Sequence, residues 1–218
     1  MKHLPSIVCA LALFGVASPV AAQQAIIPSG TYHYVVHSDG KVTGRSTVVI
    51  AHEASSVTVK ETVDLHGETV RTTRSLDPST FATLSWSGYE DTQLDTVTVA
   101  NKSATYHHGS TTTTLAAPAD APPAVFDFLI AEFATLPAMI HVTGATRYVE
   151  YCVCIGGFEV KAISIGSASA PRPPAAHLDD VAIALTADAE TATLWYDPHT
   201  FILREFDLPG ERISYVQL

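Results

Sequence analysis

Apolar and polar side chains alternate with a period of two residues through most of residues 31–114. The clearest run places Val57, Val59, Val63 and Leu65 on one parity, with Ser, Thr, Lys and Asp side chains between them. Successive side chains of a strand point to opposite faces, so this pattern predicts a half-buried antiparallel strand. Turn residues interrupt the alternation at short intervals, which predicts a meander of strands that pair in sequence order.

A helical period follows residues 120–123. Apolar side chains then recur at three- and four-residue steps, at Val125, Phe128, Leu129, Phe133 and Leu136. Asp120 is placed as an N-cap and Pro137 follows the last apolar position, so the spacing predicts one amphipathic helix near residues 122–136. Alternation then resumes and predicts six further strands, at residues 147–155, 158–165, 178–187, 191–196, 201–207 and 212–218.

These elements predict a mainly β fold, a curled antiparallel sheet or half-barrel of about 10–11 strands wrapped around a single central α-helix. Residues 23–218 are enough for one domain with a sizeable core. A sheet this broad must cover its apolar face. One helix about 20 Å long, at 1.5 Å per residue, covers only part of that face. We therefore expect an apolar concavity between helix and sheet.

One short segment occurs twice along the chain. The sequence LDPSTF at Leu76–Phe81 matches YDPHTF at Tyr196–Phe201. Aspartate accepts hydrogen bonds from the backbone ahead of it, and proline presets φ for a type I turn, so each copy predicts a bend between two strands. The repeat arises either from the same turn chemistry used twice or from an internal duplication.

The N-terminus has the three parts of a secretory signal peptide: Lys2 and His3, an apolar run at Ile7–Val16, and small residues ending at Ala22. We expect residues 1–22 to be removed near Ala22, leaving a periplasmic or extracellular protein. The single asparagine, Asn101, and the many Ala and Thr residues are typical of a GC-rich bacterial genome. The apolar run is too short to span a bilayer, and no later stretch is long enough, so no integral membrane segment is predicted.

Charge and motifs narrow the possible functions. The formal net charge is −10 and no Lys/Arg cluster occurs, which argues against a nucleic-acid partner. The ten histidines do not group with zinc-ligand spacing, and neither a Gly-x-Ser-x-Gly elbow nor a Gly-rich phosphate loop is present. The sequence therefore assigns no catalytic residue, no metal ligand and no cofactor, and favours a non-enzymatic protein.

Cys152 and Cys154 are the main candidates for chemistry. On a strand they share one face with Tyr148 and Glu150, while Val149, Tyr151 and Val153 take the opposite face, which we expect to be the core. The two thiols are then a structural pair, a strained and redox-active disulfide, or metal ligands. On this interpretation Glu150 lies on a solvated outer face.

Several segments in order resemble an uncharacterised family of bacterial secreted domains. They are a hairpin containing Gly44, the segment Ser75–Phe81, the stretch from Phe126 to Pro137, and the closing segment Trp195–Phe201. The architecture is similar to periplasmic lipoprotein-carrier folds, which implies an apolar cavity for acyl chains. Cys152, Cys154 and the proline-rich loop near Pro173 depart from that family.

We expect the concavity to bind a hydrophobic or amphipathic ligand, either a lipid or another apolar small molecule. Aromatic and large aliphatic side chains are the expected lining: Trp86, Phe128, Phe133, Leu136, Tyr151 and Trp195. Two alternatives remain. The protein is an envelope interaction or structural protein that recruits a partner by strand addition near Thr111–Thr114, or a thiol redox protein that uses Cys152 and Cys154.

Overall fold

The structure is a computed structural model that describes residues 27–65, 67–90, 93–100, 102–116, 121–127, 129–154, 157–174, 176–187, 190–209 and 213–218. The predicted signal segment and Phe128 lie outside these residues.

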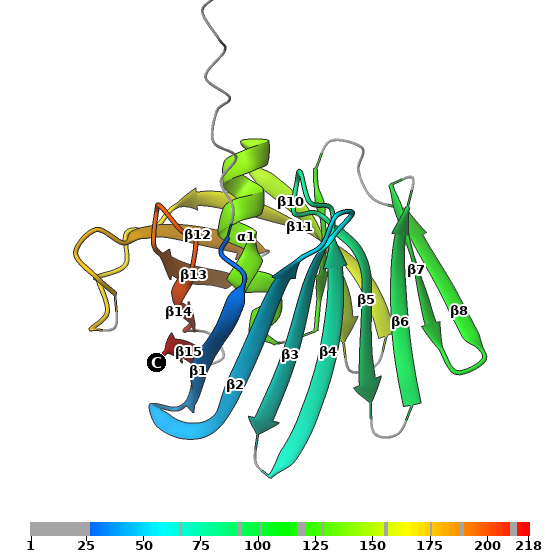
Figure 1. The fold of residues 1–218 in the computed structure, drawn as a ribbon, viewed down its shortest axis with the longest axis horizontal. Coiled ribbons are helices and arrows are strands. Elements are labelled where there is room, and N and C mark those ends of the chain that lie inside the picture. Colours follow the sequence, from blue (N-terminus) through cyan, green and yellow to red (C-terminus); the bar gives the residue numbers. More distant parts are fainter. Residues whose placement is uncertain are drawn as a thin grey trace, which may run out of the picture.

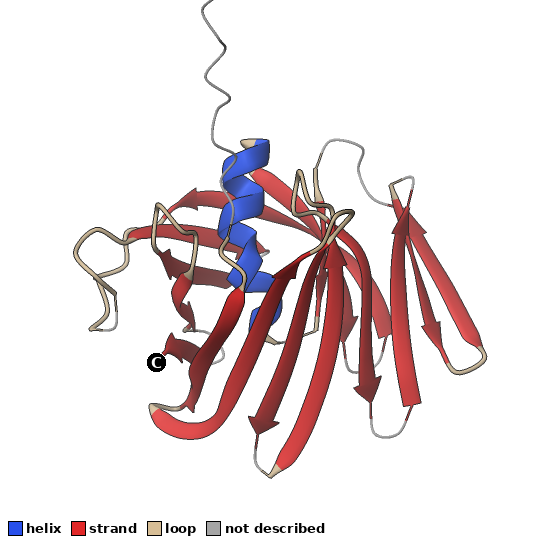
Figure 2. Ribbon diagram, viewed as in Figure 1, coloured by secondary structure: helices blue, strands red, loops and turns tan. Residues whose placement is uncertain are grey.

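Fifteen strands and one helix make up the described part of the chain (Figure 2). Before the helix the strands are β1 (Gly30–Ser38), β2 (Lys41–His52), β3 (Val57–Leu65), β4 (Glu68–Leu76), β5 (Thr83–Glu90), β6 (Gln93–Ala100), β7 (Ser103–His108), β8 (Thr111–Ala116) and β9 (Pro123–Phe126). The helix is α1 (Ile130–Thr143). After it come β10 (Arg147–Cys154), β11 (Gly157–Ser167), β12 (Val181–Ala187), β13 (Glu190–Tyr196), β14 (Leu203–Leu208) and β15 (Ile213–Gln217).

All fifteen strands belong to one sheet with the order β8-β7-β6-β5-β4-β3-β2-β1-β15-β14-β13-β12-β11-β10-β9. Neighbouring strands are antiparallel, except that β9 runs parallel to β10. Figure 1 shows that the sheet curls without closing and that α1 lies in its concavity. The predicted mainly β fold with a single helix is confirmed. The strand count is higher than predicted because short segments such as β8 and β9 carry too little alternation to be recognised.

The helix begins eight residues later than predicted, so the range 122–136 is wrong. Residues 123–126 form β9, and Pro137 lies inside α1 rather than after it. Gly144 ends the helix with a φ of 63°, and its N–H donates to the Ile140 carbonyl at 2.8 Å. Every residue from Ile130 to Met139 is buried. A helix buried on all sides has no polar face to fix its phase, which explains the misplaced boundary.

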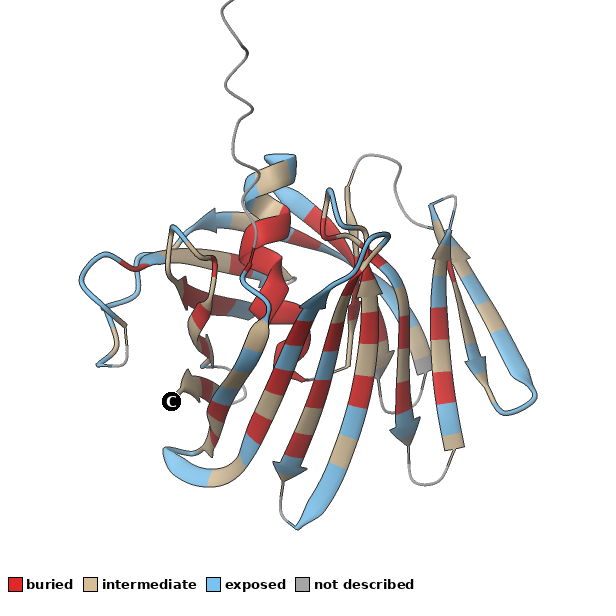
Figure 3. Cartoon of the chain, in the orientation of Figure 1, coloured by how far each residue is buried: buried red, intermediate tan, exposed pale blue. Residues whose placement is uncertain are grey.

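Two cores fill the curled sheet. The main core packs α1 against β1–β4 and β10–β15. A second core joins Trp86, Val97 and Ala104 of β5–β7 to Val125 of β9 and to Val149 and Tyr151 of β10. Strands β9 and β10 therefore lie over β5–β7 and cover the apolar face of those three strands, which α1 does not cover. Figure 3 shows the resulting bands of buried residues across the strands and along α1.

A buried ion pair holds this overlap in place. Arg74 of β4 donates to Asp127 at 2.5 Å and to the Val125 carbonyl at 3.2 Å. The Trp86 indole N–H donates to the other carboxylate oxygen of Asp127 at 2.6 Å. The side chains of Arg74 and Asp127 are 1% and 5% exposed. Asp127 thus ties the connection between β9 and α1 to strands β4 and β5.

The start of α1 is anchored to the sheet by Glu61 of β3. Leu129 occupies the N-cap position without a side-chain cap. Instead, Glu61 accepts hydrogen bonds from the backbone N–H groups of Ile130 at 3.3 Å and Ala131 at 2.7 Å, and from the Ser46 hydroxyl at 2.6 Å. These bonds satisfy helix N–H groups that have no partner within the helix.

The two matching segments form the same turn. Asp77 accepts from the N–H groups of residues 79 and 80, and Asp197 accepts from those of residues 199 and 200, at 2.8–3.0 Å. Phe81 and Phe201 then adopt φ values of 59° and 57°, and both side chains are buried in the main core. The predicted bends, between β4 and β5 and between β13 and β14, are confirmed.

We predict that Asp127→Asn destabilises the protein by about 3–5 kcal/mol, because it leaves the buried Arg74 guanidinium without a compensating charge. Urea unfolding of the variant measures this loss. Asp179→Asn is the matched control, since Asp179 is exposed and its replacement should change stability by less than about 0.5 kcal/mol. Equal stability of the two variants would contradict the role given to Asp127.

Candidate functional site

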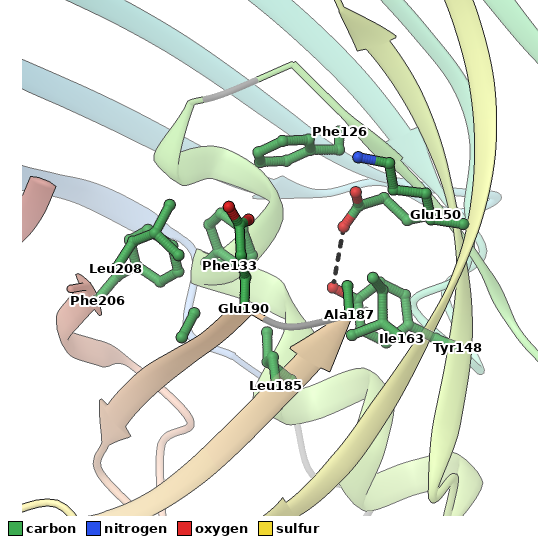
Figure 4. Close-up of a pocket in the computed structure, with 12 residues that line it drawn as sticks. Phe126, Phe133, Tyr148, Glu150, Ile163, Leu185, Ala187, Glu190, Phe206 and Leu208 are labelled. Atoms are coloured by element: carbon green, nitrogen blue, oxygen red, sulfur yellow. Dashed lines mark hydrogen bonds between the residues drawn. The ribbon is translucent and has the colours of Figure 1, made fainter. Parts of the chain in front are cut away.

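A pocket of about 130 Å³ lies between α1 and strands β10–β14. Its lining is mostly apolar, with two carboxyl groups, one hydroxyl and one ammonium group: Phe126, Phe133, Tyr148, Glu150, Lys161, Ile163, Leu185, Ala187, Glu190, Ala192, Phe206 and Leu208. Figure 4 shows Tyr148 and Glu150 on one side, with Phe206 and Leu208 across from them. An engineered apolar cavity of roughly 150 Å³ holds one benzene molecule. This pocket is therefore of a size for a single ring or a short chain.

Aromatic side chains build one wall of the pocket. The rings of Phe133 and Phe206 stack with their centroids 4.1 Å apart, and Phe126 meets Phe133 edge-on at 5.7 Å. Phe133 projects from the first turns of α1, and Phe206 faces it from β14. Because α1 is fixed at its N-terminus by Glu61, this wall has a defined position relative to the sheet.

The opposite wall is polar. The Tyr148 hydroxyl donates to Glu150 at 3.3 Å, and Lys161 of β11 is the direct cross-strand partner of Glu150. Glu150 is only 7% exposed. Burial raises the pKa of Glu150 to about 7, while Lys161 and the Tyr148 hydrogen bond act to lower it. Glu150 is thus a carboxyl group that gains or loses its proton close to neutral pH.

A second buried carboxyl group, Glu132, lies behind this wall on α1. It is 4% exposed, and the Tyr148 hydroxyl, which donates to Glu150, also acts on the Glu132 carboxyl group. Burial raises its pKa well above the usual value, and repulsion from Glu150 adds to the effect. Arg74 favours the charged form of Glu132, but that guanidinium is paired with Asp127. Ionisation of Glu150 therefore disfavours ionisation of Glu132, and the reverse also holds.

The structure brings only part of the predicted lining to this pocket. Phe133 lines it, whereas Leu136 lies in the main core. Trp86 and Tyr151 belong to the second core. Trp195 follows the core residue Leu194 on β13, so it faces the other side of the sheet, where the Arg172 guanidinium lies 5.4 Å from its ring. Phe128 lies outside the described residues.

The expectation that Tyr148, Glu150 and Cys152 lie on an outer face is wrong, because both faces of β10 are buried. Tyr148 packs into the main core and Tyr151 into the second core. Glu61 and Arg74 were not predicted from the sequence as buried charged residues. Glu61 shares its parity with Val59 and Val63, and Arg74 shares its parity with Leu76. In both cases a charged residue occupies a position where the alternation of the strand places an apolar, inward-facing residue, and this signal could have identified them.

Cys152 is fully buried and disulfide-bonded, and the side chain of Cys154 lies outside the described residues. Reactive cysteines are partly exposed and lie in electropositive surroundings. The burial of Cys152 argues against the thiol redox alternative.

Comparisons with protein families, with curated proteins and with solved structures find no match for this chain. The resemblance to secreted half-barrel domains therefore stays a prediction. Within the described residues, no helix has the length and hydropathy needed to cross a membrane, and no group of three or more His, Cys, Asp or Glu side chains is placed to hold a metal ion.

We predict that the free energy of unfolding is higher at pH 5 than at pH 8, by on the order of 2 kcal/mol. The pKa of Glu61 and of Glu150 is about 7 in the folded protein, against an ordinary value of 4.5. A raised folded pKa stabilises the fold below the unfolded value, and that stability is lost as the pH rises through 7. Asp77 and Asp197 have lowered pKa values and stay charged at pH 5.

Urea unfolding at the two pH values measures this difference. Glu61→Gln should reduce it, because the amide does not titrate. A protein that is equally stable at both pH values, or less stable at pH 5, would contradict the raised pKa values.

Proposed function

We propose that the protein binds a small amphipathic molecule in the pocket between α1 and β10–β14. The observation that carries the proposal is the pocket itself, an apolar hollow with a few polar groups on one wall, which is the usual composition of a small-molecule site. Its volume of about 130 Å³ fits the ring or the end of a short chain, with the remainder of the ligand extending past the exposed residues Lys161 and Glu190. We further propose that binding takes place in the periplasm or outside the cell.

The position of the pocket supports this proposal. The second core covers the inner face of β5–β7, and α1 packs against β1–β4 and β10–β15, with the apolar hollow left where α1 faces β10–β14. Its walls are fixed by neighbours that have other roles, since Glu61 holds α1 and Asp127 holds the segment before it. A pocket with fixed walls binds a ligand with little loss of conformational entropy.

We predict that benzyl alcohol, a neutral one-ring probe, binds in this pocket and shifts the NMR signals of its lining residues. Ala187→Leu should weaken binding by about tenfold, because extra methylenes in a packed site cost roughly 1–3 kcal/mol. Ala184→Leu is the matched control. It makes the same substitution on the same strand, but on the face away from the pocket, and should leave the affinity within about twofold.

The proposal would be contradicted if benzyl alcohol, benzylamine and benzoate all left the signals of the lining residues unchanged. It would equally be contradicted if Ala187→Leu and Ala184→Leu bound benzyl alcohol with the affinity of the unmodified protein.

A further inference from the structure

The charged groups of the pocket are unbalanced. Glu150 and Glu190 line it together with a single cation, Lys161. Glu132 adds a third carboxyl group behind the wall, and the one other cation near it, Arg74, is paired with Asp127. The pocket lining thus holds two carboxyl groups and one ammonium group, and the Lys161 side chain is itself exposed. An apolar ligand alone would leave this imbalance in place.

The hydrogen bonding of these groups is incomplete as well. Glu150 accepts one long hydrogen bond, from the Tyr148 hydroxyl at 3.3 Å. Glu132, which is 4% exposed, shares the Tyr148 hydroxyl with Glu150, because Tyr148 also acts on the Glu132 carboxyl group. Buried carboxyl oxygens without donors are costly, and each accepts readily from a cationic N–H group. An ammonium group would supply further N–H donors to Glu150.

We propose that the ligand is a small amine, an apolar ring or short chain that carries an ammonium group placed against Glu150. This inference rests on the proposed function, since it assigns the ligand class of the same pocket. The apolar part lies against Phe133 and Phe206, and the ammonium group donates to Glu150. Tyr148 orients the Glu150 carboxylate through its hydroxyl hydrogen bond.

The protonation state of Glu150 should make the affinity for an amine depend on pH. The groups that face Glu150 are Tyr148 on its own strand, Lys161 on β11 and Glu132 on α1. With a pKa of about 7, Glu150 is mostly protonated at pH 6 and mostly ionised at pH 8. An ammonium ligand prefers the ionised carboxylate, so its affinity should rise between these pH values. A neutral ligand of the same size lacks this dependence.

The test compares benzylamine, benzyl alcohol and benzoate by NMR titration of the full mature protein. Benzylamine should bind about tenfold more tightly than benzyl alcohol at pH 8, with benzoate the weakest. The preference for benzylamine should shrink at pH 6. Glu150→Gln should bring the ratio of the two affinities close to one. Glu68→Gln, the same substitution at an exposed position of the hairpin between β3 and β4, should leave the ratio unchanged.

The outcomes separate the two proposals. Equal affinities for benzylamine and benzyl alcohol would overturn the amine assignment while leaving the pocket as a binding site, and so would tightest binding of benzoate. A preference for benzylamine that survives Glu150→Gln, or that does not change with pH, would also overturn it. Absence of binding by all three probes would overturn both proposals. The comparison of probes and pH values in the unmodified protein needs no variant, so it stands if Glu150→Gln fails to fold.

Discussion

The constraint that shapes this molecule is the need to cover the apolar face of a fifteen-stranded sheet with a single short helix. The hydrophobic effect favours burial roughly in proportion to the apolar area removed from water, so an uncovered apolar face of this size is not stable in water. The helix covers β1–β4 and β10–β15, and the edge of the sheet covers β5–β7. Strands β9 and β10 lie over β5–β7 and become buried on both faces. The second core, the buried ion pair and the pocket all follow from this arrangement.

Burying β10 on both faces also explains the unusual chemistry of the site. On an ordinary half-buried strand Glu150 would point into solvent. Here its face of β10 is turned toward α1, so Glu150 meets Tyr148, Glu132 and the aromatic wall. The carboxyl groups of Glu61, beneath the start of α1, and of Asp127 are also buried, but each accepts several hydrogen bonds and has a structural role. Glu150 accepts one long hydrogen bond, from Tyr148, and this difference supports the ligand-binding role that we propose for it.

Much of the fold was predictable from local pattern. The alternation around Val57 and Val63 identified β3, and the chemistry of Asp77 and Asp197 identified two bends. These features depend on neighbouring residues alone. The position of the helix was not predictable, because α1 is buried on all sides and the apolar spacing set by Val125 continued from a strand into the helix.

The candidate site was predictable only in part, since it depends on contacts between distant strands. Phe133 was found because large apolar residues on the helix were expected to face the sheet. Glu150 was placed on the wrong face, because nothing in residues 147–154 shows that a second layer covers them. Glu61 and Arg74 carried a readable signal, a charge on the apolar parity of a strand, but their partners Asp127 and Ala131 lie more than fifty residues away in sequence.

The most direct test of this account is the pKa of Glu150, measured by a carbon-13 NMR titration of its side-chain carboxyl group in the folded protein. If β10 is buried on both faces and Glu150 lies against the pocket, the pKa is raised to about 7. A pKa near the ordinary value of 4.5 would show that Glu150 faces solvent. That result would contradict the burial of this face of β10 against α1 and the site built on it.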